Sequence, residues 1–288
     1  MAKVKTRDGT ELYVKDWGKG RPVVLIHGWP LSADSWDPIA MRLADNGYRA
    51  IAYDRRGFGR SDQPFAGYDY DTLADDLADV MQETGATSDA TLIGFSMGGG
   101  EVARYMLRHD GKGIISAALL SSVVPYMLQT EDNPDGVPQK QLEAIAKSVE
   151  EDRAAFFATF FKQFYGVGLI SHPVSSEAIQ ASWNVAMTAS LKATLACAQS
   201  FGFTDFRPDL AAFNVPTLVL HGTSDTIVPP AIGRNAAQGI RQSQYVEYDG
   251  EPHGLFLTAT DRLASDLLTF LSGSPTTATR ELEGGTLA

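Results

Sequence analysis

Short apolar runs alternate along the chain with longer amphipathic segments, a pattern typical of strands connected by helices. The apolar or alternating runs predict strands at residues 4–6, 12–16, 23–26, 49–53, 90–94, 114–121, 217–221 and 244–248. Helical periodicity predicts helices at residues 35–45, 71–84, 97–109, 230–238 and 261–271. The first two strands flank Asp8-Gly9, which indicates an antiparallel hairpin. Because helices separate the later strands, we expect an α/β fold with a mostly parallel eight-stranded sheet and helices on both faces.

The alternation breaks after the sixth strand, where only helical patterns occur. These patterns cover residues 137–151, 153–165 and, as two further helices, 175–201. An all-helical insert at this position predicts a cap over the carboxyl edge of the sheet, where α/β sheets bind ligands. The residues after the last helix are rich in Ser, Thr, Gly and charged types, so we expect a disordered tail. The expected division is a core at 1–124 and 215–272, a cap at 125–214 and a tail at 273–288.

Composition and charge limit the classes of partner. The chain carries a net charge of −11, which argues against nucleic acid and anionic membranes. No run of 18 apolar residues occurs, and the first residues lack a secretory pattern, so we expect a cytoplasmic protein. Cys197 is the single cysteine, which excludes an intrachain disulfide and a cysteine-based metal site. We interpret Cys197 as a small apolar residue of a helix and expect no metal ion.

A serine flanked by glycines stands where the fifth strand meets the following helix. The sequence Gly94-Phe95-Ser96-Met97-Gly98 fits G-x-S-x-G, the pattern of a nucleophile elbow. In so sharp a turn, side chains at the two glycine positions would collide with the neighbouring strand and helix. The turn exposes the Ser96 hydroxyl and aims the Met97 amide, at a helix N-terminus, toward a developing oxyanion. We therefore expect Ser96 to be a nucleophile and Met97 an oxyanion donor.

The same stretch also fits a dinucleotide-binding pattern. Gly98 to Ala103 reads G-x-G-x-x-A between a strand and a helix. Such a site needs an acid after the next strand, but that strand ends at 119–123 without one. The pattern usually lies on the first strand–helix–strand unit, whereas this unit is a later one. We therefore expect no nucleotide and no other cofactor.

A serine hydroxyl needs a base to remove its proton, and the chain has five histidines. His253 lies in a loop between the last strand and the last helix. It follows both the serine and the expected acid in chain order, as the base does where such an elbow occurs. His27 and His221 each end a strand before a glycine, a position that favours a role in loop structure. We therefore expect His253 to be the base.

The acid that orients this histidine has to come from the same edge of the sheet. Asp225 follows the strand at 217–221 and precedes Pro229-Pro230. An ionised Asp225 would fix the histidine tautomer and stabilise the imidazolium. Asp249 and Glu251 are nearer to His253 in sequence, but carboxylates in a turn are usually only solvated.

The second oxyanion donor should come from the loop His27-Gly28-Trp29-Pro30. Pro30 has no amide hydrogen, so the Trp29 amide is the candidate, with its indole as a wall of the pocket. Large apolar residues of the cap and of the loops near the sheet could form the remaining walls. The expected substrate-binding residues are Trp29, Val123, Phe160, Phe164, Phe201 and Ile227. The polar stretch 53–61 carries arginines that could bind an anion, but we favour a role in bracing neighbouring loops.

Together these motifs resemble the cofactor-free bacterial haloperoxidase and arylesterase branch of the α/β-hydrolases. The resemblance runs from about residue 5 to 271, is weakest in the cap and has no counterpart in the tail. It implies a triad of Ser96, Asp225 and His253, oxyanion amides at Trp29 and Met97, and no cofactor. Members of this branch hydrolyse small esters, many convert acids and peroxide into peracids that oxidise halide, and some open lactams. The motifs that carry it are Gly94 to Gly98, His27 to Pro30, Asp54 to Gly59 and Pro252 to Gly254, with Gly99-Gly100 where relatives often have Thr-Gly.

We therefore expect a serine esterase that acts on a small-molecule ester, with hydrogen peroxide as a second acyl acceptor. A lactamase or another amide or carbon–carbon bond hydrolase, and a hydrolase-fold receptor, remain alternatives. A haloperoxidase activity would be secondary to peracid formation. A dehalogenase or epoxide hydrolase is disfavoured because those enzymes have an aspartate where this chain has Ser96. The sequence leaves open whether the chain forms a homo-oligomer.

Overall fold

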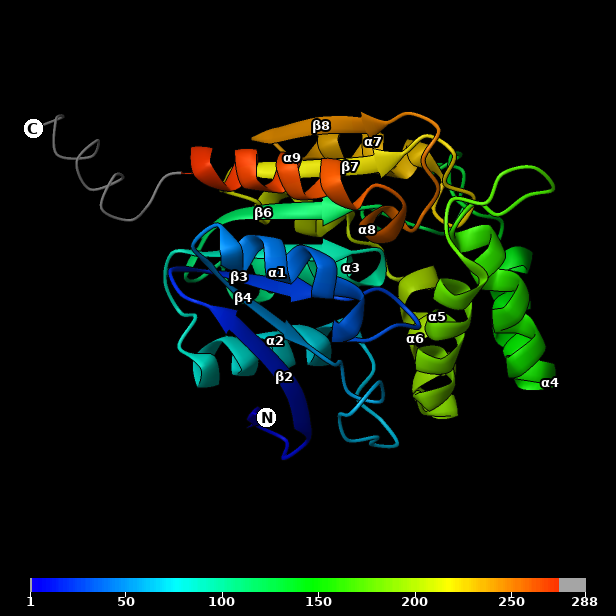
Figure 1. Cartoon of the computed structure of the whole chain (residues 1–288), viewed down its shortest axis with the longest axis horizontal. Helices are drawn as coiled ribbons and strands as arrows, with labels where there is room; N and C mark the ends of the chain where they lie inside the picture. Colours follow the sequence, from blue (N-terminus) through cyan, green and yellow to red (C-terminus); the bar gives the residue numbers. More distant parts are fainter. Residues whose placement is uncertain (1, 275–288) are drawn as a thin grey trace, which may run out of the picture.

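An eight-stranded sheet runs through the centre of the computed structural model, which describes residues 2–274 (Figure 1). Its spatial order is β1-β2-β4-β3-β5-β6-β7-β8. The β1–β2 and β2–β4 pairs are antiparallel, and all the other pairs are parallel. The strands are β1 (Ala2–Lys5), β2 (Glu11–Gly18), β3 (Arg21–Ile26), β4 (Tyr48–Tyr53), β5 (Ala90–Phe95), β6 (Ile114–Leu120), β7 (Thr217–Gly222) and β8 (Ser243–Tyr248). The predicted mostly parallel sheet, including the hairpin at Asp8-Gly9, is confirmed.

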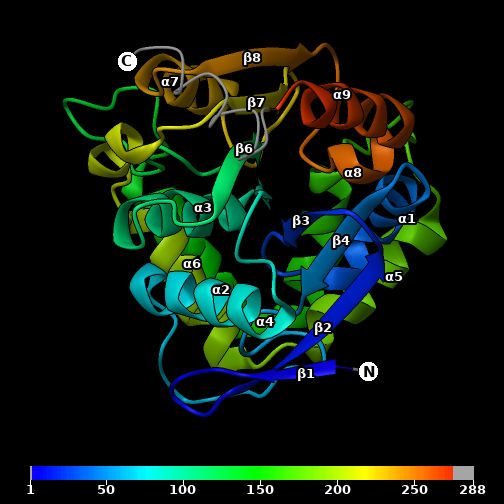
Figure 2. The ribbon, with the colours of Figure 1, turned by 90° about the vertical axis from the view of Figure 1, so that its left-hand side faces the viewer.

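Helices cover both faces of this sheet (Figure 2). One layer contains α1 (Asp37–Asp45), α8 (Leu255–Thr258) and α9 (Thr260–Gly273). The other contains α2 (Tyr70–Thr84), α3 (Met97–Arg108) and α7 (Pro230–Gly239). Strands β5, β6 and β7 are buried along their whole length, because helices exclude water from both sides. This explains why these segments are continuous apolar runs rather than alternating ones.

Three helices form the insert between β6 and β7: α4 (Gln139–Phe164), α5 (Ser176–Thr188) and α6 (Leu191–Phe203). They lie together beyond the carboxyl ends of the parallel strands, and we call them the cap helices (Figure 1). Helix α4 breaks at Asp152, whose backbone has φ −155° and ψ 88°. The Asp152 Oδ1 atom accepts a hydrogen bond from the Ala155 amide at 2.9 Å, as an N-cap does. The two predicted helices at 137–151 and 153–165 are therefore the two arms of α4.

The two ends of this insert meet beside the sheet. The amide of Phe206 donates a hydrogen bond to the carbonyl of Pro125 at 2.8 Å. Between Pro125 and Phe206 the chain extends over the carboxyl edge of the sheet and then returns to the same place. A short helix, η2 (Arg207–Ala212), then leads back to β7.

The structure adds short elements that the pattern did not predict. Helix α8 and the helices η1 (Ala33–Trp36) and η2 are too short to show helical periodicity. The first two residues of the tail expected from residue 273 are held in place, because α9 extends to Gly273 and Arg21 donates to the carbonyl of Ser274 at 3.0 Å. The rest of that predicted tail, residues 275–288, lies outside the described residues. Within residues 2–274, no helix combines the length and the apolar character needed to cross a bilayer.

Candidate active site

The G-x-S-x-G segment forms a sharp turn between β5 and α3. Ser96 has φ 54° and ψ −118°, a conformation that residues other than glycine rarely adopt. A Cβ atom at Gly94 would lie 2.5 Å from the carbonyl oxygen of Gly98, and a Cβ at Gly98 would overlap the backbone of Ile26. Both glycines are therefore needed, because the backbone at the start of α3 lies directly against the backbones of β5 and β3.

Three side chains that are distant in sequence meet at the carboxyl edge of the sheet. His253 Nε2 lies 3.0 Å from Ser96 Oγ, and His253 Nδ1 lies 2.7 Å from Asp225 Oδ2. Ser96, Asp225 and His253 stand in the connections that follow β5, β7 and β8. A carboxylate only accepts, so Nδ1 carries the hydrogen and Nε2 is free to accept the hydrogen of the Ser96 hydroxyl. This tautomer is the one a general base requires.

Asp225 remains ionised although it is buried. Its Oδ1 atom accepts hydrogen bonds from the amides of Ile227 and Val228, both at 2.9 Å. Burial alone would raise the pKa of Asp225, but His253 and His221 outweigh it and hold the pKa well below its usual value. The carboxylate is thus negative over the whole neutral range and can stabilise a positive charge on His253.

His221 contacts the same carboxylate, which sequence reasoning missed. Its Nε2 atom donates to the carbonyl of Val228 at 3.0 Å and lies 3.3 Å from Asp225 Oδ2. The Nδ1 atom is buried and has no hydrogen-bond partner in the described chain. A Cβ atom at Gly233 would overlap this ring. The four-residue spacing of His221 and Asp225 at the end of β7 was the only signal in the sequence.

The Trp29 amide lies on the loop after β3, and the Met97 amide is the first of α3, directly after Ser96. Among the described residues, neither amide donates to a backbone carbonyl. The Trp29 indole donates to the carbonyl of Thr194 in α6 at 3.0 Å. This bond ties the loop after β3 to the cap. The role of both amides as oxyanion donors stays a prediction.

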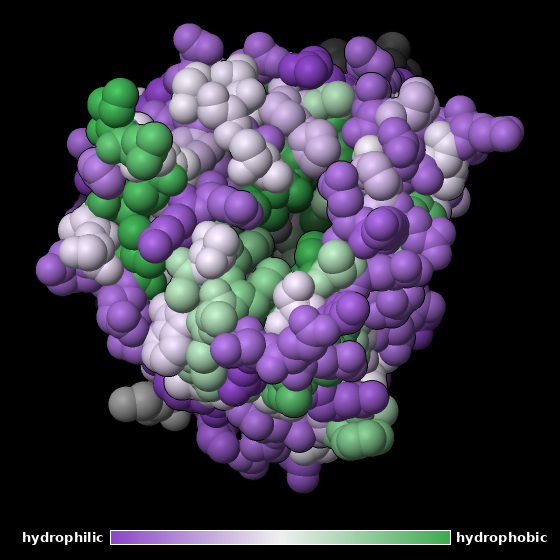
Figure 3. Space-filling view, turned by 90° about the vertical axis from the view of Figure 1, so that its right-hand side faces the viewer, coloured by the Kyte–Doolittle hydropathy of each residue, from purple (hydrophilic) through white to green (hydrophobic). Residues whose placement is uncertain are grey.

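A cavity of about 340 Å³ opens over Ser96. Its lining residues come from the sheet edge and from the cap, and none of them is charged. A hollow with hydrophobic side chains in its interior is visible on this face of the molecule (Figure 3). Of the expected substrate-binding residues, those that border the cavity are Trp29, Val123, Phe160, Phe201 and Ile227. Sequence reasoning missed Leu142 and Ile145 of α4, because apolar periodicity does not show which residues of a cap helix face the site, and it missed Met127 in the connection before α4.

Phe164 does not border the cavity, contrary to the expectation from sequence. It is fully buried and packs edge-on against His253, with ring centroids 4.9 Å apart. Phe95 contacts the same imidazole at 4.9 Å. Phe160 and Phe164 share a helix face, but Phe164 lies one turn farther along, over the imidazole. Its position keeps water away from the His253 ring and limits its rotation.

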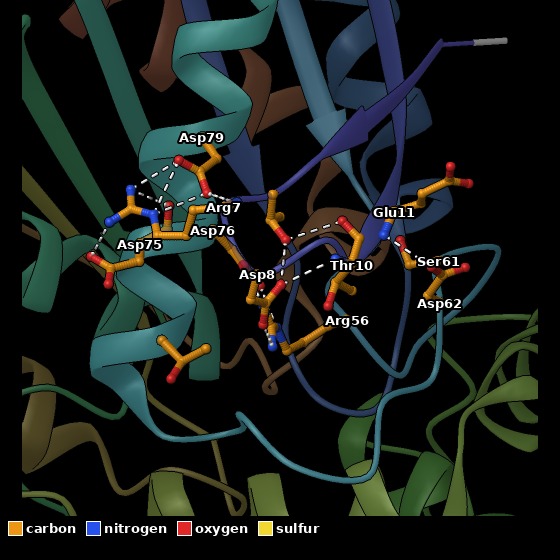
Figure 4. Close-up of polar contacts among 12 residues, drawn as sticks. Arg7, Asp8, Thr10, Glu11, Arg56, Ser61, Asp62, Asp75, Asp76 and Asp79 are labelled. Carbon is orange, nitrogen blue, oxygen red and sulfur yellow. Dashed lines mark hydrogen bonds and ion pairs between the residues drawn. The ribbon is translucent and has the colours of Figure 1, made fainter.

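The arginine-rich stretch 53–61 pairs with acids of the protein itself. Arg56 donates to Asp76 in α2 at 2.6 Å and to Asp8 of the hairpin at 2.8 Å (Figure 4). Arg7 of the hairpin donates to Asp79 of the same helix (Figure 4). These pairs hold the β1–β2 hairpin against α2. The guanidinium groups are occupied, in agreement with the expected bracing role rather than with an anion site.

Arg55 supports the loop that carries Trp29. Its side chain is buried with Glu101, its amide donates to His27 Nε2 at 3.0 Å, and its guanidinium donates to the His27 carbonyl at 2.6 Å. Burial and the neighbouring Arg55 charge hold the pKa of His27 well below its usual value, so His27 stays neutral. His27 is therefore a fixed acceptor at the base of the loop.

Two other sequence features have structural explanations. Gly99 and Gly100, part of the apparent dinucleotide pattern, face Ser122 and the rings of Tyr70 and Phe206, where a Cβ would overlap. Burial raises the pKa of Cys197 to about 12, so its thiol stays protonated. The glycines serve helix packing, and Cys197 is a small buried residue of α6, as expected.

Comparison with known proteins identifies the family. A family model described as alpha/beta hydrolase fold matches residues 21–260. The chain therefore belongs to the α/β-hydrolase family. It is 43% identical over 270 residues to a non-heme chloroperoxidase of Kitasatospora aureofaciens, covering 93% of this chain and 98% of that protein.

Two further similarities lie in the same branch. A bifunctional esterase/perhydrolase of Acinetobacter calcoaceticus is 37% identical over 275 residues, covering 94% of this chain and 99% of that protein. The crystal structure of a bromoperoxidase from Bacillus anthracis superimposes with a TM-score of 0.91 at 42% identity, covering 94% of this chain and 99% of that chain. The branch expected from the motifs is confirmed.

Proposed function

We propose that this protein is a serine hydrolase that cleaves small carboxylic esters through an acyl-enzyme. The observation that carries the proposal is the continuous hydrogen-bond chain from Ser96 through His253 to Asp225 at one end of an uncharged cavity. We assign Ser96 as the nucleophile, His253 as the general base and acid, and Asp225 as the group that orients His253. Residues 1–124 and 215–272 form the core in this proposal, and residues 125–214 form the cap.

Acylation follows from this geometry. The Ser96 oxygen attacks the ester carbonyl while His253 Nε2 takes the hydroxyl hydrogen. Asp225 stabilises the resulting imidazolium through the short contact to Nδ1. The amides of Trp29 and Met97 donate to the developing oxyanion, helped by the N-terminal end of α3. His253 then returns the proton to the alcohol oxygen as the ester bond breaks, and Ser96 retains the acyl group.

Deacylation needs a second nucleophile, and we propose that both water and hydrogen peroxide serve. Water gives the carboxylic acid. Hydrogen peroxide gives a peracid, while His253 transfers the proton of the attacking peroxide back to Ser96. The peracid then oxidises a halide ion to hypohalous acid by two electrons and is itself reduced to the carboxylic acid. The names of the relatives support this extension, because they combine esterase, perhydrolase and non-heme chloroperoxidase activities.

The cavity indicates the substrate class. Its walls are largely aromatic and aliphatic, and a volume of about 340 Å³ suits a small molecule. No lining residue offers a charge to pair with an ionic substrate. We therefore propose small uncharged esters as substrates. The named relatives favour ester cleavage over amide or carbon–carbon bond hydrolysis and over a ligand-binding receptor.

A panel of p-nitrophenyl esters tests the proposal on the wild type and on Ser96→Ala, with and without hydrogen peroxide. We expect turnover of acetate and butyrate esters by the wild type, and loss of nearly all of it in Ser96→Ala. Halide oxidation should require both peroxide and a carboxylic acid or ester, and it should disappear in the same variant. Ester turnover that persists in Ser96→Ala would refute the assigned nucleophile.

A further inference from the structure

A second hollow lies on the cap, beside the cavity over Ser96. Its volume is about 430 Å³, and we call it the outer hollow. Ser148 and Glu151 border it from the first arm of α4, and Ala155 and Thr159 border it from the second arm. It therefore occupies the angle that the break at Asp152 creates. The mechanism proposed above makes no use of this space.

The outer hollow and the catalytic cavity have a common wall. Phe156, Phe160 and Gln163 border both spaces. The rings of Phe156 and Phe160 stack on each other with centroids 5.6 Å apart and an interplanar angle of 20°. Their other aromatic neighbours include Trp29, the inner wall of the cavity. Two phenyl side chains thus separate the spaces, and side chains can change rotamer far more easily than backbone can move.

We propose that the outer hollow is a distal subsite for esters with long arms, which reach it past the Phe156–Phe160 pair. The inference rests on the proposed esterase function and extends its substrate class. The apolar part of the arm would lie along the two rings. Gln163, exposed at the border of both spaces, would face the polar side of the path.

The charges around the outer hollow define the end of the arm. The charged side chains that border it are Glu151 and Asp152, both exposed carboxylates. Lys147 lies 3.7 Å from Glu151 but does not border the hollow. An anionic end would meet two negative charges without a lining cation to offset them. The subsite therefore suits a neutral or cationic end, so an ω-ammonium ester should be preferred over the matching ω-carboxylate ester.

Two alanines of α4 supply a matched pair of variants. Ala155 and Ala158 are both exposed on the second arm, and only Ala155 borders the outer hollow. We expect Ala155→Trp to fill the hollow and lower kcat/KM for decanoate esters about tenfold, while acetate turnover stays unchanged. Burial of one methylene group changes binding about fourfold, so a tenfold loss corresponds to the exclusion of between one and two methylene groups. Ala158→Trp should change neither substrate.

Truncation of the common wall should have the opposite effect. Phe160→Ala should raise the decanoate-to-acetate ratio of kcat/KM about tenfold, and Phe160→Leu should give a smaller increase with less loss of packing. Adding Ala155→Trp to Phe160→Ala should cancel the gain. The series is run with p-nitrophenyl acyl esters and with acetate esters of graded alcohols, which shows whether the acyl or the alcohol arm enters the hollow.

Binding of the same esters to Ser96→Ala, measured by calorimetry, tests the subsite separately from turnover. We expect affinity to increase with arm length, and Ala155→Trp to abolish the increase. Equal length profiles for Ala155→Trp and Ala158→Trp, in binding or in turnover, would overturn the subsite even if short esters are hydrolysed. If affinity for Ser96→Ala increases with arm length but the wild type hydrolyses none of the esters, the subsite would be supported and the esterase proposal refuted.

Discussion

The Asp225 carboxylate lies under the edge of the sheet, where two backbone amides and His253 donate to it. Each of these donors favours the charged form over the neutral acid. An asparagine has nearly the same shape but no charge, and it can present a donor to the wrong side of the imidazole. The electrostatic and the orienting effects of Asp225 can therefore be removed together without a change in volume.

We expect Asp225→Asn to lower kcat for p-nitrophenyl acetate by about 10³–10⁴-fold, because the imidazole would lose its required tautomer. Asp249→Asn is the matched control, since Asp249 is an exposed turn residue near His253 in sequence. Steady-state kinetics on both variants, with circular dichroism to check folding, measures the effect. Similar losses in the two variants would contradict the assignment of Asp225.

His221 is a positioning residue for Asp225 in our interpretation. Removal of its donor should raise the pKa of Asp225, because His221 is one of the groups that lower it. A carboxylate of higher pKa would hold the shared hydrogen more tightly and stabilise the imidazolium form of His253. The acid limb of kcat/KM should then move to higher pH.

The test compares His221→Leu with His221→Gln, whose amide nitrogen can replace the Nε2 donor. We expect His221→Leu to lower kcat about tenfold, in line with loss of one hydrogen bond to a charged group, and to shift the acid limb. His221→Gln should retain most of the activity and the wild-type pH profile. A purely structural role would lower stability in His221→Leu and leave its pH profile unchanged.

At the scale of elements, the break in α4 shows how a single side chain divides a helix. Asp152 leaves helical geometry and caps the second arm with its own carboxylate. Arg153 then donates to the carbonyl of Ala189 at 2.8 Å, which anchors the start of that arm near the end of α5. The catalytic cavity and the outer hollow are both bordered by residues from the two arms.

We expect Asp152→Ala to lower the free energy of unfolding by about 1 kcal/mol, the usual loss for an N-cap. Asp152→Asn should change the free energy of unfolding by only a few tenths of a kcal/mol, because asparagine caps a helix as well as aspartate does. Urea denaturation at neutral pH measures both. An Asp152→Ala variant as stable as the wild type would show that the cap bond contributes little to this helix.

Sequence periodicity predicted the long elements well and the short ones poorly. Continuous apolar runs gave β5, β6 and β7, because strands covered on both faces must exclude polar side chains. Helix α8 has only four residues, fewer than the two turns over which a periodic pattern can be recognised. The pattern predicted a boundary between two helices near Asp152, but it could not show how the two helices are oriented relative to each other.

The site was predictable to the extent that it depends on chain order and turn chemistry. Ser96 and its glycines are fixed by a local turn, so a short motif shows them. The contacts of Phe164 and His221 depend on how distant segments pack, and Phe164 illustrates the limit. It shares a periodic face with Phe160 but contacts His253 instead of bordering the cavity.

For the molecule as a whole, buried His27 makes stability depend on pH. The folded protein keeps His27 neutral, whereas the unfolded chain binds a proton there below its ordinary pKa of 6.5. The unfolded state therefore binds more protons as the pH falls, and stability conferred by neutral His27 above pH 6.5 is lost below it. When the unfolded state binds one proton more than the folded state, the free energy of unfolding falls by about 1.4 kcal/mol for each pH unit of acidification.

We expect the free energy of unfolding of the wild type to fall by about 1 kcal/mol more than that of His27→Gln between pH 7 and pH 5.5. Glutamine can still accept from the Arg55 amide, so the loop after β3 should keep its support. Urea titrations at the two pH values measure the difference. Parallel losses in the two proteins would show that His27 is protonated in the folded state.

The bond between Phe206 and Pro125 makes the insert a loop whose two ends coincide in space. A segment closed in this way can be replaced by another of different length at a small entropic cost, about 0.6 kcal/mol for each doubling of length. The serine, histidine and aspartate all stand outside residues 125–206. Replacement of the insert would thus leave the attachment points of Ser96, Asp225 and His253 in place, but it would remove the contact of Phe164 with His253 and the bond from Trp29 to Thr194.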